Sequence, residues 1–227
     1  MDRQLWLSIK CKESLMKSYF VKTPGLVQKI FPNYAWRIRT KKKEIYLTFD
    51  DGPIPDFTPW VLKTLKKYDA KATFFCVGEN IKRNPDIFEQ IVNDGHRVGN
   101  HTFNHLQGWK TSTQKYIKNI LKAESYFQEL PQNKGAKLFR PPHGRIKPIQ
   151  SRILRKKGYK IVMWDVLSGD FDQSLSKEQC LEHTLKHINS GSIVVFHDSV
   201  KSFKNLDYVL PRLLEYYSSK AYEFKSL

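Results

Sequence analysis

From residue 44 onwards, the chain alternates between short apolar runs and longer segments whose apolar residues recur at helical spacing. Runs typical of strands span residues 45–49, 72–77, 97–99, 137–139, 160–164, 193–196 and, more weakly, 222–224. Helices are predicted between them, at residues 59–68, 85–93, 113–130, 149–157, 177–188 and 206–217. Strand–helix alternation repeated about six times predicts a parallel sheet covered by helices.

The strands have the pattern of buried strands. Residues 193–196, Ile-Val-Val-Phe, form a continuous apolar run, which is typical of a parallel strand covered on both faces. The number of strand–helix units favours a closed or nearly closed barrel over an open sheet, since no part of this region differs in composition as a second domain would. We therefore predict an α/β fold of the (β/α)-barrel type, formed by residues 44–227 as one domain.

Residues 1–43 are predicted to be a basic N-terminal extension, with little periodicity beyond a short apolar cluster at residues 26–31. Met16 is an alternative translation start, which would leave residues 1–15 outside the protein. Lys10 and Lys12 interrupt the first apolar run, which is too short for a signal peptide, and no later stretch reaches transmembrane length. On sequence alone we expect a cytoplasmic chain without an export signal.

The composition is typical of one large domain with a buried hydrophobic core, since 40% of the 227 residues are hydrophobic and 13% are aromatic. The 39 Lys and Arg residues outnumber the 22 Asp and Glu residues, which gives a net charge of +17. This charge favours peripheral association with an anionic envelope polymer, although it is also common in lysine-rich proteomes. Because no nucleic-acid-binding motif accompanies the charge, we predict no nucleic-acid partner. The three widely spaced cysteines argue against a disulfide framework and a thiolate zinc site.

Two adjacent carboxylates end the first predicted strand. Asp50 and Asp51 are followed by a Gly-Pro pair that turns the chain. Successive strand side chains point to opposite faces, so both carboxylates can reach one ligand only where the strand ends and the backbone bends. Catalytic groups usually lie at this end of a parallel barrel. The alternative is an ordinary Asp-Gly turn with solvated carboxylates.

Two histidines, four residues apart, follow the third predicted strand. His101 and His105 would lie on one face of a helical turn, so both imidazoles can meet one ion. Zinc binds histidine nitrogen and carboxylate oxygen, and catalytic zinc sites keep three protein ligands and an open position. Together with Asp51, the two histidines form a candidate metal site. His96 precedes the strand and is interpreted as structural.

Three further polar clusters follow predicted strands. Arg140 ends one strand and supplies a permanent positive charge, and the two prolines after it fix an extended loop. Residues 164–172 carry three acids and two aromatics, although any one acid there is an ordinary loop residue. His197 ends the most apolar strand, where a lone histidine is usually a satisfied core residue. Five clusters at the same end of their strands favour one shared site.

These five clusters, in this order, resemble the motifs of the NodB-homology polysaccharide deacetylases, carbohydrate esterase family 4. The first motif, Thr-Phe-Asp-Asp-Gly-Pro, matches residues 48–53 letter for letter. The second, His-Ser/Thr-x-x-His, matches residues 101–105. The third, Arg-Pro-Pro-Tyr-Gly, is met except that His143 replaces the tyrosine. The fifth, Leu-x-His, is met with Val195 in place of the leucine.

The fourth motif departs most from the family pattern, Asp-x-x-Asp-Trp. Leu167 and Phe171 stand at its two ends, and only Asp170 is kept. In relatives the first aspartate of this motif tunes the acid histidine of the fifth motif. Asp165, Asp170 and Asp198 are the candidates to replace it here, and the sequence leaves the choice among them open.

The resemblance implies a distorted (β/α) barrel of about seven parallel strands and a divalent metal, most commonly Zn²⁺, with Co²⁺, Ni²⁺ or Mn²⁺ as alternatives. By analogy Asp51, His101 and His105 hold the metal, and Asp50 is the general base. Arg140 would orient Asp50.

The resemblance also implies the remaining roles. His197 would be the general acid, with Asp170 as the catalytic-site acid that the fourth motif keeps. We expect substrate contacts from Pro141, Pro142 and His143. The backbone N–H of His143 would help to bind the oxyanion. Trp164, Phe171 and Val195 are expected to wall an apolar pocket for the acetyl methyl group.

The function that the resemblance implies is metal-dependent removal of N-acetyl groups from a glycan that contains N-acetylglucosamine, of the peptidoglycan or chitin type. The alternatives are an O-acetyl esterase acting on xylan-type polymer and a catalytically weakened carbohydrate-binding relative. The family usually acts on envelope or extracellular glycans, in contrast to the location expected from the sequence. The oligomeric state stays open.

Overall fold

The computed structural model describes residues 19–127 and 137–227, and the expectations about residues 1–15 lie outside these ranges. Parallel strands form a curled sheet in the order β5-β4-β3-β2-β1-β7-β6, with a short β8 beside β1. Their bounds are β1 Glu44–Asp50, β2 Ala72–Cys76, β3 Arg97–Asn100, β4 Lys137–Phe139, β5 Tyr159–Ile161, β6 Val166–Leu167, β7 Ile193–His197 and β8 Glu223–Phe224. The predicted distorted (β/α) barrel of about seven parallel strands is confirmed.

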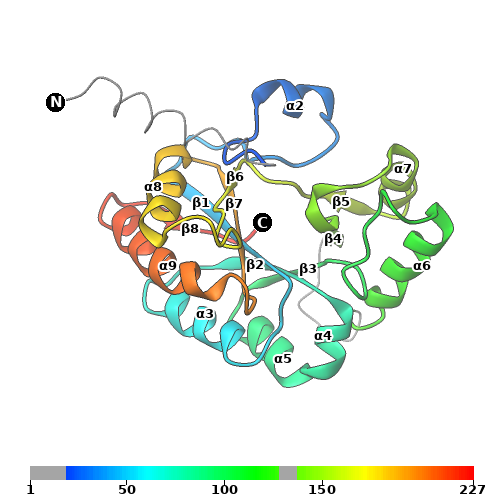
Figure 1. Ribbon diagram of the computed structural model, residues 1–227, viewed down its shortest axis with the longest axis horizontal. Helices are drawn as coiled ribbons and strands as arrows, with labels where there is room; N and C mark the ends of the chain where they lie inside the picture. The colour runs from blue at the N-terminus through cyan, green and yellow to red at the C-terminus, as the bar shows by residue number, and fades with distance from the viewer. Residues whose placement is uncertain (1–18, 128–136) are drawn as a thin grey trace, which may run out of the picture.

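Helices cover the outer face of the curled sheet (Figure 1). Their bounds are α2 Gly25–Ile30, α3 Phe57–Lys66, α4 Gly78–Arg83, α5 Pro85–Asn93, α6 Thr113–Glu124, α7 Pro148–Lys156, α8 Lys177–His187 and α9 Phe203–Ser218. None of the helices in the described ranges is long and apolar enough to cross a membrane.

The alternation of side chains along β1 separates the main core from the barrel interior. Phe49 points towards the helices and stacks between Phe74 of β2 and Phe196 of β7, with ring centroids 5.0 and 5.9 Å away. Tyr46 belongs to a smaller buried cluster, on the other face of the sheet. Asp50 follows the same alternation as Tyr46 and therefore points into the barrel interior.

The described part of the N-terminal extension is packed into the fold rather than appended to it. Lys22 forms a bridge with Val166 of β6, and Ala35 forms one with Val162, just after β5. The Lys22 ammonium also pairs with the buried Asp165 at 2.6 Å. Because β5 and β6 are the two ends of the sheet order, this segment spans the gap at which the barrel does not close by strand pairing.

Some element boundaries differ from the predictions. β5 ends at Ile161, and Val162 beyond it forms an isolated bridge with Ala35, whose N–H donates to the carbonyl of Ile161 and whose carbonyl accepts the N–H of Met163. α6 ends at Glu124, so the predicted helix 113–130 is too long, and its last three residues lie outside the described ranges. β6 and α4 were not predicted, because two residues and six residues, respectively, are too short for a clear periodic signal.

Candidate active site

A cavity of about 500 Å³ opens at the carboxyl ends of the strands, and residues of all five polar clusters line it. Its polar lining includes Asp50, Asp51, His101, His105, His143 and His197. Its apolar lining is formed by Trp164, Leu167, Phe171 and Val195. Segments that are far apart in the sequence therefore meet at one place.

The two adjacent carboxylates reach this cavity because the backbone bends after β1. Asp50 is the last residue of the strand, and Asp51 leaves it with a φ of 85°. The side-chain amide of Asn80 donates to the carbonyl of Asp51 at 2.7 Å and holds the bend. Gly52 is required there, because a Cβ would collide with the carboxylate of Asp198, which accepts the Gly52 N–H at 3.1 Å.

His101 and His105 lie in a loop and not on the helical turn that their spacing suggested. Thr102 and His105 have φ values of 67° and 55°, which a right-handed helix does not contain. The side chain of Asn100 accepts the N–H of Thr102 at 2.9 Å and stabilises the loop conformation. The prediction of a helical turn is therefore wrong, although both imidazoles face the same point.

The side chains of Asp51, His101 and His105 converge. Nε2 of His105 lies 3.4 Å from Oδ1 of Asp51, and Nε2 of His101 lies 3.8 Å from the same oxygen. The three donor atoms all lie within 4.8 Å of one another. Ligands at about 2.0–2.2 Å around a tetrahedral zinc ion stand about 3.4 Å apart, so these separations fit an ion of that size.

The state of His101 also fits a metal ligand. Its Nδ1 donates to the backbone carbonyl of Arg140 at 2.8 Å, so Nε2 keeps its lone pair and is directed towards Asp51. Burial lowers the pKa of His101 to about 4, which leaves the imidazole neutral at pH 7, as metal binding requires. Two imidazoles and one carboxylate are the donor set of a catalytic site with an open position, so these residues fit the implied divalent metal.

Arg140 holds Asp50 from behind the cavity. The guanidinium is fully buried, and its Nη1 donates to Asp50 at 2.7 Å and to the hydroxyl of Thr48 at 2.7 Å. Nη2 donates to the carbonyl of Met163 at 2.9 Å, and the group lies 4.1 Å from the centroid of the Phe75 ring. A buried charge that is paired and hydrogen-bonded on all sides keeps a fixed position, so Asp50 is fixed as well.

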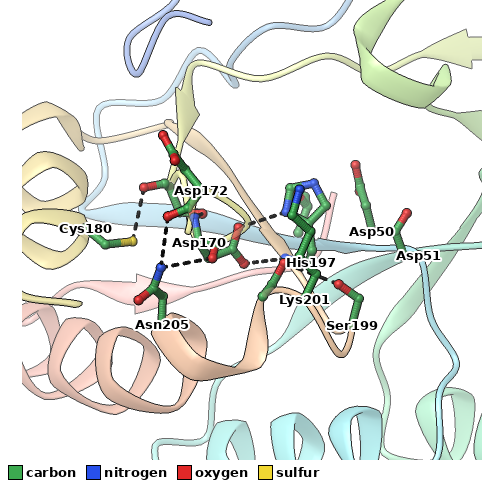
Figure 2. Close-up of polar contacts among 12 residues, drawn as sticks. Asp50, Asp51, Asp170, Asp172, Cys180, His197, Ser199, Lys201 and Asn205 are labelled. Atoms are coloured by element: carbon green, nitrogen blue, oxygen red, sulfur yellow. Dashed lines mark hydrogen bonds and ion pairs between the residues drawn. The ribbon is translucent and has the colours of Figure 1, made fainter. Parts of the chain in front are cut away.

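His197 approaches the cavity from β7, where it is the register partner of Asp50. One oxygen of Asp170 lies 2.8 Å from Nδ1 of the imidazole, and the other accepts the His197 N–H at 2.7 Å (Figure 2). Asn205 donates to the backbone carbonyl of Asp170 at 3.1 Å and thereby fixes the loop that carries the acid. Because Nδ1 is occupied, Nε2 is the nitrogen that is available to the cavity.

The pKa of His197 depends on this pair. Burial acts to lower the pKa, but the charge and hydrogen bond of Asp170 and the charges of Asp51 and Asp50 outweigh it. The result is a pKa raised from 6.5 to about 9. The imidazole is therefore protonated at neutral pH and can give a proton to a leaving group.

Of the three acids that the sequence left open as partners of His197, the geometry selects Asp170. Asp165 pairs with Lys22 and accepts the hydroxyl of Ser192 at 2.7 Å, away from the cavity. Asp198 accepts the hydroxyl of Thr58 at 2.5 Å and the N–H of Gly52. Both acids are thus occupied by contacts other than one with His197.

The expected substrate contacts are brought to the cavity only in part. Trp164, Phe171 and Val195 line it, and so does the exposed His143. Pro141 and Pro142 are buried behind the loop and do not line the cavity.

Sequence reasoning missed several further lining residues. Among them are Tyr19, Gln107, Lys110, Arg145 and Lys201. Tyr19 comes from the N-terminal extension and donates to Asp172 at 2.7 Å. No motif marks these positions, and Arg145 is the only one that directly follows a motif.

A buried carboxylate, an imidazole paired with an acid, and a metal-type donor set therefore surround one cavity at the end of a (β/α) barrel. These are the groups with which hydrolytic enzymes activate water and protonate a leaving group.

Comparison with known proteins gives the family. The polysaccharide deacetylase family profile matches residues 37–162. The chain is 35% identical over 191 residues to a peptidoglycan-N-acetylglucosamine deacetylase of Bacillus cereus, covering 84% of this chain and 89% of that protein. It is 33% identical over 164 residues to a chitooligosaccharide deacetylase of Azorhizobium caulinodans, covering 72% of this chain and 78% of that protein.

A solved structure shows the same similarity. A crystal structure of a peptidoglycan N-acetylglucosamine deacetylase in complex with an N-oxidanyl-benzamide compound superposes with a TM-score of 0.81 at 32% identity, covering 90% of this chain and 95% of that one. The chain belongs to the polysaccharide deacetylase family, carbohydrate esterase family 4.

Proposed function

We propose that the protein is a metal-dependent deacetylase that removes N-acetyl groups from a glycan containing N-acetylglucosamine, of the peptidoglycan or chitin type. The observation that carries the proposal is the convergence of Asp51, His101 and His105 beside the buried Asp50–Arg140 pair. The relatives named above, which are deacetylases of peptidoglycan and of chitooligosaccharide, support the choice of substrate class.

Asp51, His101 and His105 would hold the divalent ion, with Zn²⁺ the best match to their donor atoms and Co²⁺, Ni²⁺ and Mn²⁺ as alternatives. A bound ion supplies a Lewis acid that polarises the acetyl carbonyl and makes water a stronger acid. Every remaining part of the reaction is assigned to groups of the chain itself.

Asp50 is the general base that accepts a proton from the attacking water. Its hydrogen bond to the fixed guanidinium of Arg140 directs the carboxylate into the cavity. As the carbon–nitrogen bond of the acetamide breaks, His197 gives its Nε2 proton to the departing amine, which is a poor leaving group without it. The pair with Asp170 keeps that proton on His197 at neutral pH.

The apolar side chains of Trp164, Leu167, Phe171 and Val195 would enclose the acetyl methyl group. The backbone N–H of His143 would contribute to oxyanion binding, and this role is independent of which side chain stands there. Because the Asp170–His197 pair is intact, the departure at Leu167 is expected to leave the acid function in place.

An acetate-release screen tests the proposal. We expect acetate from N-acetylglucosamine oligomers in the presence of Zn²⁺ and its loss with a chelator. Release from acetylated xylan alone would instead identify an O-acetyl esterase. No release from either substrate with any of the four metals would contradict the proposed activity and favour a carbohydrate-binding relative.

A further inference from the structure

A rigid platform lies at the rim of the cavity, formed by the loop around Trp109 and the loop around Arg145. The indole ring is 58% exposed, yet its N–H donates to the carbonyl of Ile146 at 3.1 Å. Lys147 donates to the carbonyl of Thr111 at 2.8 Å and joins the two loops a second time. An exposed aromatic ring that is held in one orientation is preorganised to bind a ligand.

The two loops also approach closely at Gly108. A Cβ at this position would lie 2.8 Å from the carbonyl oxygen of Arg145, so a larger residue would push the loops apart. The side-chain amide of Gln150 donates to the carbonyl of Gly108 at 3.0 Å and holds the contact. The position of Trp109 relative to the cavity is therefore built into the backbone of both loops.

Positive charge gathers at the same rim. The guanidinium of Arg145 lies 5.4 Å from the centroid of the Trp109 ring, and both Arg145 and Lys110 line the cavity. Within the described part of the chain, the only carboxylates that line the cavity are Asp50 and Asp51. The cations of the rim thus face a ligand space whose only fixed negative charges belong to the catalytic centre.

We propose that Trp109, Lys110 and Arg145 form a second sugar subsite, which stacks a pyranose ring on the indole and binds a carboxylate carried by that sugar. The inference rests on the proposed function, since it concerns the neighbouring unit of the same glycan. A sugar ring offers an apolar face to an aromatic ring, and the planar guanidinium matches a carboxylate with two parallel hydrogen bonds. A neutral polymer would offer neither cation an anionic partner.

Binding is measured by calorimetry with the Asp50→Asn variant of the full chain, so that turnover does not interfere. The two ligands are a tetrasaccharide of N-acetylglucosamine and a tetrasaccharide that alternates N-acetylglucosamine with N-acetylmuramic acid, which carries a carboxylate on the sugar. Using glycan free of peptide separates a carboxylate on the sugar from carboxylates on attached peptides. We expect the carboxylated ligand to bind about five-fold more tightly, since two partly exposed ion pairs are available.

Three derivatives of this variant test the residues. The double change Lys110→Ala with Arg145→Ala is expected to remove the preference for the carboxylated ligand. Trp109→Ala is expected to lower the affinity for both ligands roughly ten-fold. The matched control, Arg155→Ala with Lys156→Ala, removes two exposed cations from α7 and should keep the preference. Equal affinity for the two ligands before these changes, or a preference that survives loss of Lys110 and Arg145, would overturn the subsite. Absence of acetate release by the unaltered protein would instead overturn the proposed function, because the binding comparison does not depend on turnover.

Discussion

Replacing Asp50 by Asn is expected to lower kcat/KM roughly 10³-fold, which is the scale of a lost general base. The amide keeps the size of the side chain and can still accept the hydrogen bond from Arg140, but it cannot take a proton from water. Metal affinity is expected to stay unchanged, because Asp50 does not belong to the three-donor set. Acetate release and zinc binding are measured on the same preparation.

The control for this prediction is Asp86→Asn, which removes an exposed carboxylate from the first turn of α5. It should match the unaltered protein in both measurements. The Asp50→Asn change also leaves the buried Arg140 without its anion, so circular dichroism is used to compare equal amounts of folded protein. Loss of zinc from Asp50→Asn would show that Asp50 is a ligand and would contradict its assignment as the base.

Replacing Asp170 by Asn is expected to lower kcat roughly 10²-fold at neutral pH and more above it. In the unaltered protein the acid His197 loses its proton as the pH rises through about 9, so activity should fall on that alkaline side. Without the charge of Asp170, the pKa of His197 should be lower than in the unaltered protein, because burial is then opposed only by the charges of Asp51 and Asp50. The alkaline limb of the pH profile should therefore move to lower pH, which a merely structural change would not cause.

Stability should follow the same linkage. Since the folded pKa of His197 is raised above 6.5, the protonated group stabilises the fold fully below pH 6.5, and this contribution is lost as the pH rises through about 9. Urea unfolding of the unaltered protein should show this loss, and Asp170→Asn should show less of it. An alkaline limb of the pH–activity profile that lies at the same pH in the unaltered protein and in Asp170→Asn would contradict the proposed role of Asp170.

The barrel could be predicted because its strands carry their own signal. Buried parallel strands are continuous apolar runs, and β1, β2 and β7 were found from them directly. The bend after Asp50 was also predictable, since adjacent strand residues cannot otherwise share a cavity. The packing of the segment from Lys22 to Ala35 across the gap between β5 and β6 was not predictable, because it acts through isolated bridges that leave no periodic pattern.

The candidate site was predictable where one residue type is chemically required, and not where several residues compete. The sequence offers three acids as candidate partners of His197, and only the structure shows that Asp170 is the one that reaches the imidazole. The spacing of His101 and His105 suggested a helical turn, although local hydrogen bonds of the loop bring the imidazoles together. The rim residues follow from contacts between two loops, which single-sequence reasoning does not see.

Metal titration of acetate release tests the central claim most directly. After treatment with a chelator, activity on an N-acetylglucosamine oligomer is expected to return with added Zn²⁺ and to stop rising at one equivalent per chain, in accord with the one group of three donors found within residues 19–127 and 137–227. His101→Ala should show no such recovery at the same zinc concentrations. Activity that persists through chelation, or full recovery in His101→Ala, would contradict an ion held by Asp51, His101 and His105 as the centre of the reaction.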